Sequence, residues 1–354
     1  MLYGGLKLAD RRSLAPNGLP AGPLGPGLSV IIPERANPVP LGQCLDTVRT
    51  ATGDLPEPWE VIVVVNGWPK RCYRDLVSEH TEVRWIFSEK PLWFSGAIRR
   101  GLQAARYDWV YLLNNDMVVD PLAFFSLLYW RSPRVFGIAS QIYFRDAERR
   151  REETGWTMFR ESDGVFEIRD EVADDETTVR GTFYAGGGAS LFQRHLLMQL
   201  LRQSSVYLPF YWEDVEWGTR AWRRGYRSLY CPASKVWHGH RQTNRKFFSE
   251  VEIDRILNRN RLVFQLRNGP SPDSLQQLRE MLARLDPKSQ AEILTPGRVA
   301  RIVSGRAAHL PLAPVWEQQY GCIEDRVIIC DGDEPGGLAR GFERAGSGYI
   351  SPIP

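Results

Sequence analysis

The sequence predicts an α/β fold whose mostly parallel, twisted sheet carries helices on both faces. Short apolar runs at 28–32, 60–65 and 109–113 have the length of strands and no polar face, as is typical of central strands in a parallel sheet. Segments with helical spacing separate these runs, and each run ends in polar or turn-forming residues. Such alternation implies parallel pairing with right-handed crossovers between the strands.

The first half of the chain repeats this unit of strand and helix. The predicted order is a strand at 28–32, a helix at 40–50, a strand at 60–65, a helix at 71–79, a strand at 83–87, a helix at 95–105, a strand at 109–113 and a helix at 121–131. Asp120 followed by Pro121 is typical of an N-cap and a first helical turn, which sets the start of the last helix. We expect the strand ends near Pro33, Asn66 and Asn114 to converge on one crevice.

The regular alternation of predicted strands and helices ends after residue 131. Residues 145–180 are charged, polar and poorly periodic, so we expect a mobile excursion or a small ribbon over the site. The other elements predicted here are a strand at 135–144, a helix at 194–202, a helix within 209–226, a strand at 228–231, an alternating strand before residue 238, a helix at 250–266 and two short amphipathic helices within 273–306.

Three hydrogen-bonding side chains, Asn114, Asn115 and Asp116, directly follow the apolar run at 109–113. Because open α/β sheets bind ligands at the carboxyl ends of their strands, these side chains are candidate ligand-binding groups. The alternative is an ordinary loop between a strand and a helix, which this segment alone does not distinguish.

A second polar cluster lies at the start of the helix predicted within 209–226. Glu213 and Asp214 come directly after three aromatic residues. The helix dipole favours acids in a first turn, which explains part of this pattern. A carboxylate beside aromatic surface also suits a base with a shifted pKa and sugar rings stacked nearby. Trp93 and Trp212 are therefore either sugar-stacking platforms or residues of the core.

Consecutive glycines at Gly186, Gly187 and Gly188 permit a ligand to approach the backbone closely. Their spacing matches neither a P-loop nor a dinucleotide-binding fingerprint, and a structural bend is the alternative. His238 follows an alternating strand and is either a hydrogen-bonded structural residue or a metal ligand that closes the crevice.

Composition and charge narrow the classes of function. A formal net charge of +3 over 354 residues does not indicate a nucleic-acid partner. The amino terminus lacks a charged start followed by an apolar stretch, and no run reaches the length that spans a bilayer, although peripheral contact with a membrane stays open. The 5 cysteines are scattered without metal-binding spacing, which predicts reduced thiols in a cytoplasmic protein.

Taken in order, these motifs make residues 28–266 resemble the family 2 glycosyltransferases with a GT-A fold. The matching motifs are Ser29-Val-Ile-Ile-Pro33, Glu60-Val-Ile-Val-Val-Val-Asn-Gly67, Phe94-Ser-Gly-Ala-Ile-Arg-Arg-Gly101, Leu112-Leu-Asn-Asn-Asp116 and Tyr211-Trp-Glu-Asp-Val-Glu216 with Arg220, Gly225 and Tyr226. Their order looks most like the rhamnosyltransferase branch of bacterial surface-polysaccharide enzymes. Val65 departs from the family, in which an acid often ends the second strand and can read a pyrimidine base.

The resemblance implies inverting transfer of a sugar from a nucleotide diphosphate sugar to a hydroxyl group of a glycan or lipid-linked acceptor, in surface polysaccharide synthesis. A UDP- or dTDP-sugar is the expected donor. Asp116 and His238 would bind Mg²⁺ or Mn²⁺. Asp214 would be the general base, and Glu213 would orient it or bind the acceptor. The residues expected to bind the nucleotide sugar are Pro33, Glu34, Arg35, Asn66, Gly96, Arg100, Asn114 and Asn115, and those expected on the acceptor side are Gly186, Gly187, Gly188 and Trp212.

These expectations divide the chain into three parts. A flexible leader rich in glycine and proline spans 1–27, a GT-A domain spans 28–268, and a helical extension with an irregular tail spans 269–354. Within the domain, 28–120 is the expected nucleotide-binding half and 121–268 the acceptor half. We expect the protein in the cytoplasm, where it would work in solution or at the inner face of the membrane.

Two other functions are weighed against this one. A nucleotidyltransferase should carry a glycine-rich, basic loop after the first strand, but residues 33–38 contain no glycine. A non-catalytic module that binds carbohydrate or nucleotide and descends from such an enzyme would release no nucleotide diphosphate from a donor sugar at any metal concentration.

Overall fold

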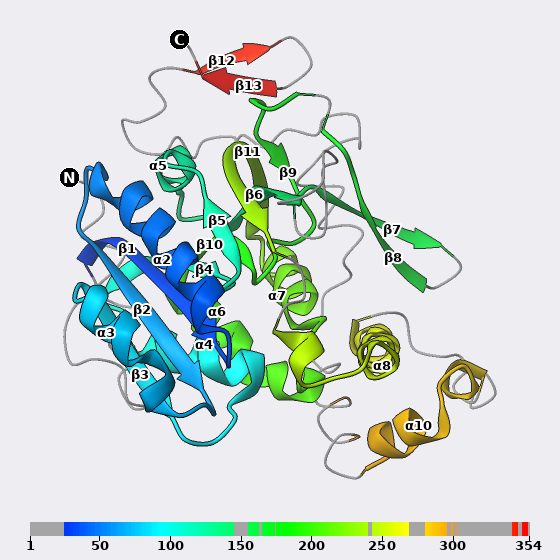
Figure 1. The fold of residues 1–354 in the computed structure, drawn as a ribbon. Coiled ribbons are helices and arrows are strands. Elements are labelled where there is room, and N and C mark those ends of the chain that lie inside the picture. Colours follow the sequence, from blue (N-terminus) through cyan, green and yellow to red (C-terminus); the bar gives the residue numbers. More distant parts are fainter. Residues whose placement is uncertain are drawn as a thin grey trace.

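A computed structural model describes residues 25–144, 155–162, 165–173, 175–239, 243–268 and 280–295, residues 299 and 302, and two strands at 342–345 and 349–352. A curled sheet runs through the body of the protein and is flanked by helices (Figure 1). The mixed α/β architecture predicted from the sequence is confirmed.

Four neighbouring strands form the parallel part of the sheet. In spatial order they are β3 (Val83–Ser88), β2 (Trp59–Asn66), β1 (Gly25–Glu34) and β4 (Tyr107–Leu113). Ile31 of β1 pairs with Ile62 on one side and Leu112 on the other. Because the strands are parallel, their carboxyl ends lie along one edge of the sheet.

The remaining strands extend the sheet beyond β4. β10 (Ala189–Gln193) is antiparallel to β4 and to β6 (Val135–Phe144). β11 (Arg227–His238) is parallel to β6 and antiparallel to β5 (Met117–Val119) and β9 (Arg180–Gly181). The sheet is therefore mostly parallel in its first half and mixed in its second.

Different helices cover the two faces of the parallel strands, because successive side chains of a strand point to opposite sides. Val30 belongs to the cluster that contains the buried side of α2 (Pro38–Gly53). Its neighbour Ile31 belongs to the cluster that contains α4 (Trp93–Ala104) and α6 (Arg194–Leu200). Gly101 lets α4 approach closely, since a Cβ there would lie 2.4 Å from Ile31 Cγ2.

Several boundaries differ from those predicted. The first strand begins at Gly25 rather than Leu28. The helix predicted at 121–131 spans only Ala123–Leu128 as α5, because the N–H of Leu122 donates to Asp120 Oδ1 at 2.9 Å in a turn that precedes the helix. β5 and β10 are short antiparallel strands that the sequence pattern did not reveal. The other helices are η2 (Lys70–Tyr73), α3 (Arg74–Glu79), η3 (Leu201–Tyr207), α7 (Glu213–Trp222), η4 (Asn244–Lys246), α8 (Glu250–Asn268) and α10 (Pro287–Ile293).

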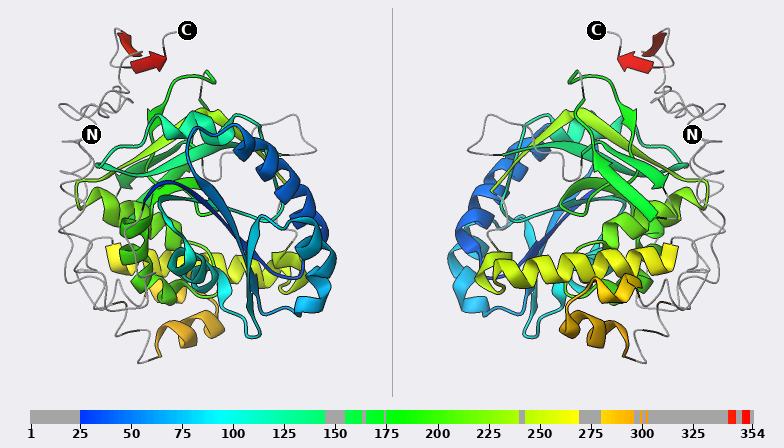
Figure 2. Two further views of the ribbon diagram at one scale, coloured as in Figure 1. Left: turned by 90° about the vertical axis from the view of Figure 1, so that its left-hand side faces the viewer. Right: turned by 90° about the vertical axis from the view of Figure 1, so that its right-hand side faces the viewer.

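The ribbon predicted within 145–180 is present as the hairpin of β7 (Thr157–Ser162) and β8 (Val165–Asp170). In the extension, α10 packs against α8 (Figure 2). A second hairpin, β12 (Phe342–Ala345) with β13 (Tyr349–Pro352), lies in the tail that was predicted to be irregular. The cysteines at 44, 72 and 231 are free thiols, whereas residues 1–24, 322 and 330 lie outside the described residues.

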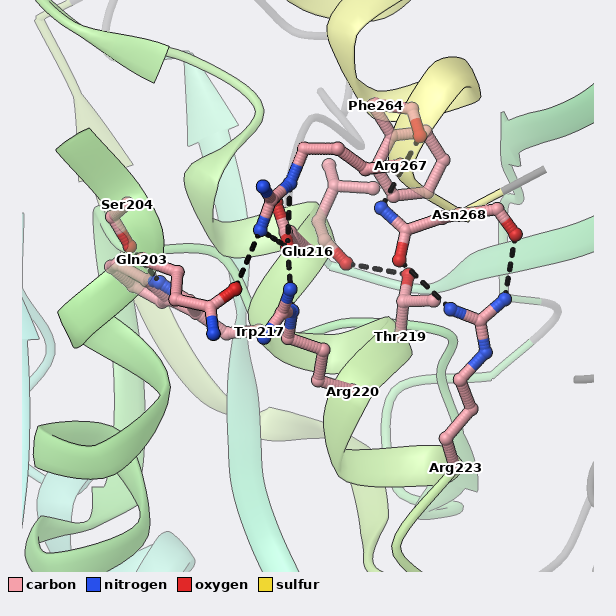
Figure 3. A network of polar contacts seen from close by, with 11 residues as sticks. Gln203, Ser204, Glu216, Trp217, Thr219, Arg220, Arg223, Phe264, Arg267 and Asn268 are labelled. Carbon is pink, nitrogen blue, oxygen red and sulfur yellow. Dashed lines mark hydrogen bonds and ion pairs between the residues drawn. The ribbon is translucent and has the colours of Figure 1, made fainter. Parts of the chain in front are cut away.

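Helices α7 and α8 are joined by a buried charge network (Figure 3). Glu216 of α7 accepts hydrogen bonds from Arg220 Nε at 2.5 Å and from Arg267 Nη2 of α8 at 2.6 Å, and all three side chains are at most 6% exposed. Burial alone would raise the pKa of Glu216, but the two guanidinium charges outweigh it and hold that pKa below its ordinary value. The network therefore fixes α7 against α8 at neutral pH.

Glu216→Gln should lower the free energy of unfolding by about 3–5 kcal/mol, because it leaves two buried guanidinium charges without their carboxylate. Urea denaturation measures this loss. Glu167→Gln is the matched control, since Glu167 pairs with Arg169 on the surface, where the side chains are 38% and 60% exposed. Exposed pairs contribute about 0–1 kcal/mol, so equal losses in the two variants would contradict a structural role for the network.

Candidate active site

The carboxyl ends of β1, β2 and β4 open into a crevice of about 460 Å³. The predicted convergence is confirmed, since Pro33, Asn66 and Asn114 all line this crevice. The opposite wall comes from β8, from the start of α7 and from residues 243–248, which follow β11. The crevice thus lies between the parallel half of the sheet and the mixed half.

Asp116 and His238 lie together in this crevice, with His238 Nε2 at 3.3 Å from Asp116 Oδ1. Strand pairing brings them together: His238 of β11 is in register with Met117 of β5, and the N–H of Gly239 donates to the carbonyl oxygen of Asp116 at 2.9 Å. Asp116 is 5% exposed and His238 is 8% exposed. A carboxylate oxygen and an imidazole nitrogen at this separation form a donor set that fits a divalent metal ion.

Glu34 and Asn115 contact each other beside this pair. The Asn115 amide donates to Glu34 Oε2, and Glu34 Oε1 accepts from the Asn37 N–H at 2.6 Å and from the Tyr73 hydroxyl at 2.8 Å. Burial raises the pKa of Glu34, while these donors partly offset the effect. Thr243 donates to Asn115 Oδ1 at 3.3 Å, so Glu34 and Asn115 shape the crevice through contacts within the protein.

Asn66 lines the crevice, but its amide also contacts the backbone that leads into α4. Its Nδ2 donates to the carbonyl oxygen of Trp93 at 3.1 Å, and its Oδ1 accepts from the N–H of Leu92. Trp93 has a positive φ of 59°, which non-glycine residues adopt rarely. Asn66 therefore fixes the bend that places the Trp93 ring in the crevice wall.

Arg35 is a cationic side chain in the wall of the crevice. Its guanidinium lies 3.9 Å from the centroid of the Phe247 ring and 5.5 Å from that of Trp93. Within the described part of the chain, no hydrogen-bond partner contacts its buried Nε. Burial lowers the pKa of Arg35 without removing its charge at neutral pH. Lys246 lies close by, where it donates to Asn37 Oδ1 at 2.6 Å.

Two carboxyl groups stand at the start of α7, on the other side of the crevice. Asp214 Oδ2 accepts from the N–H of Gly187 at 3.1 Å, and Oδ1 accepts from the N–H of Val215 at 2.9 Å. Burial raises the pKa of Asp214, and these amides partly offset it. Glu213 is 2% exposed and its Oε2 has no hydrogen-bond partner among the described residues, so burial and then the Asp214 charge raise its pKa well above the ordinary value. Of the two groups, Asp214 is therefore the one that ionises first.

Most of the site residues predicted from the sequence line the crevice. They are Pro33, Glu34, Arg35, Asn66, Asn114, Asn115, Asp116, Gly188, Trp212, Glu213, Asp214 and His238. The other four do not. Gly96 and Arg100 lie on α4, where Arg100 is exposed, whereas Gly186 and Gly187 are buried behind the wall. Gly187 acts on the crevice through its N–H, which holds Asp214.

Several crevice residues were not predicted. Asp170 and Ile168 of β8 line the crevice together with Tyr184, as do Thr243, Asn244, Phe247 and Phe248. Asn244 Nδ2 donates to the Tyr211 hydroxyl at 3.1 Å, and the rings of Phe248 and Phe210 contact at 5.1 Å between centroids. The aromatic pair Phe247 and Phe248, next to Lys246, is the feature of the sequence that could have indicated this part of the crevice.

One further group of potential metal ligands, Asp46, Glu79 and His80, lies outside the crevice lining. Asp46 Oδ1 already pairs with Arg49 Nη2 at 2.7 Å, on an exposed helix face. Among the described helices, none is long and apolar enough to cross a membrane.

The fold of this chain is similar to that of solved structures. The crystal structure of GalNAc-T7 with UDP, GalNAc and Mn²⁺ has a TM-score of 0.53 at 14% identity and covers 79% of this chain, which spans 58% of that one. The mannosyltransferase PcManGT from Pyrobaculum calidifontis, in complex with GDP-Man and Mn²⁺, has a TM-score of 0.46 at 16% identity, with 83% and 81% of the two chains covered. TarS 1–349 from S. aureus has a TM-score of 0.46 at 10% identity, with 79% and 81% covered. No curated protein sequence matches with significance.

The family model for Glycosyl transferase family 2 matches residues 29–201. This stretch includes the parallel strands, Asp116 and Gly187, whose N–H donates to Asp214, whereas α7 and His238 follow it in the chain. The match agrees with the GT-A arrangement of the sheet and with the motifs that border the crevice. Residues 29–201 are therefore similar to a glycosyltransferase family 2 domain.

Proposed function

We propose that the protein is a metal-dependent, inverting glycosyltransferase that moves a sugar from a nucleotide diphosphate sugar to a hydroxyl group of a glycan or lipid-linked acceptor. The observation that carries this proposal is the presence of the buried pair of Asp116 and His238 and the amide-held carboxylate of Asp214 in one crevice. A role in surface polysaccharide synthesis, in the manner of the rhamnosyltransferases, rests on the family motifs alone.

The nucleotide would bind on the side of Arg35, Asn114 and Trp93. A diphosphate carries negative charge, and Arg35 offers a desolvated cation whose Nε has no protein acceptor in the described residues. The Trp93 ring in the wall provides a flat apolar surface for a base or a sugar. Because the GalNAc-T7 structure contains UDP and Mn²⁺, a UDP-sugar is the first donor to test.

Asp116 and His238 would hold Mg²⁺ or Mn²⁺ at the diphosphate. When bound, such an ion neutralises phosphate charge and stabilises the leaving nucleotide. Asp116 is the anionic ligand of the pair, and His238 adds a nitrogen donor that Mn²⁺ accepts readily. Asn114 lies next to them, with its N–H donating to the carbonyl oxygen of Gly188 at 2.8 Å, which ties the nucleotide side to the acceptor side.

Asp214 would act as the general base for the acceptor hydroxyl. Its ionised oxygens are aimed by the N–H groups of Gly187 and Val215, and its raised pKa makes it a stronger proton acceptor than an exposed aspartate. Burial and the Asp214 charge raise the pKa of Glu213, which favours its protonated form, and in that form it would donate a hydrogen bond to the acceptor or to Asp214. Asp170 and Trp212 complete the acceptor side.

Asp116→Ala should abolish metal-dependent nucleotide binding, because it removes the only anionic member of the proposed ligand pair. Calorimetric titration with UDP, dTDP and GDP, each with Mn²⁺ and with chelator, measures this. The wild type should bind one nucleotide tightly with Mn²⁺ and weakly with chelator. Unchanged metal dependence in the variant would place the ion elsewhere, and no binding by the wild type would favour a non-catalytic module.

Asp214→Asn should lower kcat by about 10²–10⁴-fold and leave the Kd for the donor nucleotide within about two-fold, since a base acts mainly in the transition state. The substitution keeps the shape of the side chain but removes the acceptor for the proton. Steady-state kinetics supply kcat, and calorimetric titration with the nucleotide supplies the Kd. A parallel loss of nucleotide affinity would contradict the assignment.

The pH dependence of kcat should show an acid limb governed by Asp214. Its pKa is raised above the ordinary value of 3.8 by burial, and the group must be ionised to accept a proton. Activity should therefore fall as the pH drops through this raised pKa, well before an exposed aspartate would titrate. The profile is measured at saturating donor and metal, and an acid limb that persists unchanged in Asp214→Asn would assign it to another group.

A further inference from the structure

The segment at 207–212, which leads directly into Glu213 and Asp214, has irregular backbone. It contains a cis peptide bond between Leu208 and Pro209, and Tyr211 and Trp212 both have positive φ, at 75° and 76°. Left-handed backbone at two successive non-glycine residues persists only where the surrounding structure dictates it. What holds this segment therefore decides where the start of α7 lies.

Helix α8 supplies the hydrogen-bond donors that the segment needs. Asn260 is fully buried, and its Nδ2 lies 2.7 Å from the carbonyl oxygen of Tyr207, 2.9 Å from that of Phe210 and 3.0 Å from that of Tyr211. The neighbouring Arg259 donates through Nη2 to the carbonyl oxygen of Leu208. Since buried carbonyl groups require donors, these two side chains serve the carbonyl groups of Tyr207, Leu208, Phe210 and Tyr211, while the N–H of Phe94 donates to that of Pro209 at 3.3 Å.

The same helix also contacts the residues that flank Glu213 and Asp214. The Phe264 ring lies 5.3 Å from the Trp212 ring between centroids, and Arg267 pairs with Glu216 one turn into α7. Positions 260, 264 and 267 follow the spacing of one helix face. Figure 3 shows Arg267 of this face reaching from α8 to Glu216 of α7. The start of α7 is thereby held on both sides of Asp214.

Asn260 is itself held in place from the extension. Arg259 Nε donates to Asn260 Oδ1 at 3.1 Å, so that the amide presents its Nδ2 to the loop. Glu292 of α10 pairs with Arg259 and also with Arg255, the latter at 2.9 Å. These contacts link α10, through Arg259 and Asn260, to the segment at 207–212.

We infer that Asn260, oriented by Arg259, is a positioning residue that fixes the backbone of 207–212 and so directs Asp214 into the crevice. The inference rests on the proposed role of Asp214 as the base. Asn260 contacts neither donor nor acceptor in this arrangement, because it acts only through the carbonyl groups of the loop. Its loss should therefore reduce turnover without reducing nucleotide affinity.

Asn260→Ala tests the inference, with Asn268→Ala as the matched control. Asn268 is another buried amide of α8, but it contacts Arg223 at the far end of α7. The three measurements are calorimetric Kd for UDP, dTDP or GDP with Mn²⁺, kcat for hydrolysis of the corresponding nucleotide sugar, and hydrogen exchange of the peptide that spans 207–216. Arg259→Lys is a milder second variant, because lysine keeps the charge near Glu292 but cannot serve Leu208 and Asn260 together.

In Asn260→Ala, kcat should fall about 10–100-fold, as expected for a misplaced catalytic group, while the nucleotide Kd stays within about two-fold. Hydrogen exchange at 207–216 should rise at least about ten-fold, in contrast to Asn268→Ala. Arg259→Lys should show the same pattern at smaller amplitude, which decides the question if the alanine variant does not fold. Equal kcat per folded molecule and equal exchange in the Asn260 and Asn268 variants would overturn the inference. A wild type that binds no nucleotide would instead overturn the proposed function, and the exchange comparison would still decide whether Asn260 fixes the segment.

Discussion

Buried backbone must find hydrogen-bond partners, and this requirement determines where Asp214 lies. In the parallel part of the sheet, hydrogen bonds from neighbouring strands satisfy this requirement, which makes the sheet rigid. The segment at 207–212 lies outside the strands, and four of its carbonyl groups accept hydrogen bonds from Asn260 and Arg259 of α8. The crevice therefore has one wall set by strand pairing and another set by side chains of a helix that follows the family match at 29–201.

The pair of Asp116 and His238 depends on strand register in the same way. Asp116 follows β4, and the chain then turns into β5, which pairs with β11 so that Met117 stands opposite His238. A slip of one residue in this pairing would turn the imidazole to the other face of the sheet. The short strand β5, which has no strong sequence pattern, is thus what brings a polar strand end and a distant histidine within 3.3 Å.

The sequence predicted the parts of the fold in which local pattern and tertiary structure agree. Short apolar runs form the parallel strands, and the rule that ligands bind at the carboxyl ends of strands placed Asn114 in the crevice. The same rule could not reveal that Asn66 contacts the backbone of Leu92 and Trp93, because those partners come from a different part of the chain. Asp170 was not predicted for a related reason. A charged residue in a poorly periodic segment is typical of solvated surface, and only the pairing of β7 with β8 places it in the crevice.

The distribution of charge along the crevice gives the chemistry its direction. Arg35 lies in the wall of the crevice, where the proposed diphosphate would be neutralised, and Asp214 lies with Asp170 elsewhere in the same lining. Two adjacent ionised carboxylates at the start of α7 would repel each other in a buried setting. The N–H groups of Gly187 and Val215 donate to Asp214, whereas burial and the Asp214 charge raise the pKa of Glu213, so the first negative charge falls on Asp214. A preferred proton acceptor and a cation in a single crevice would suit the proposed reaction, in which a neutral hydroxyl group is deprotonated while an anionic nucleotide departs.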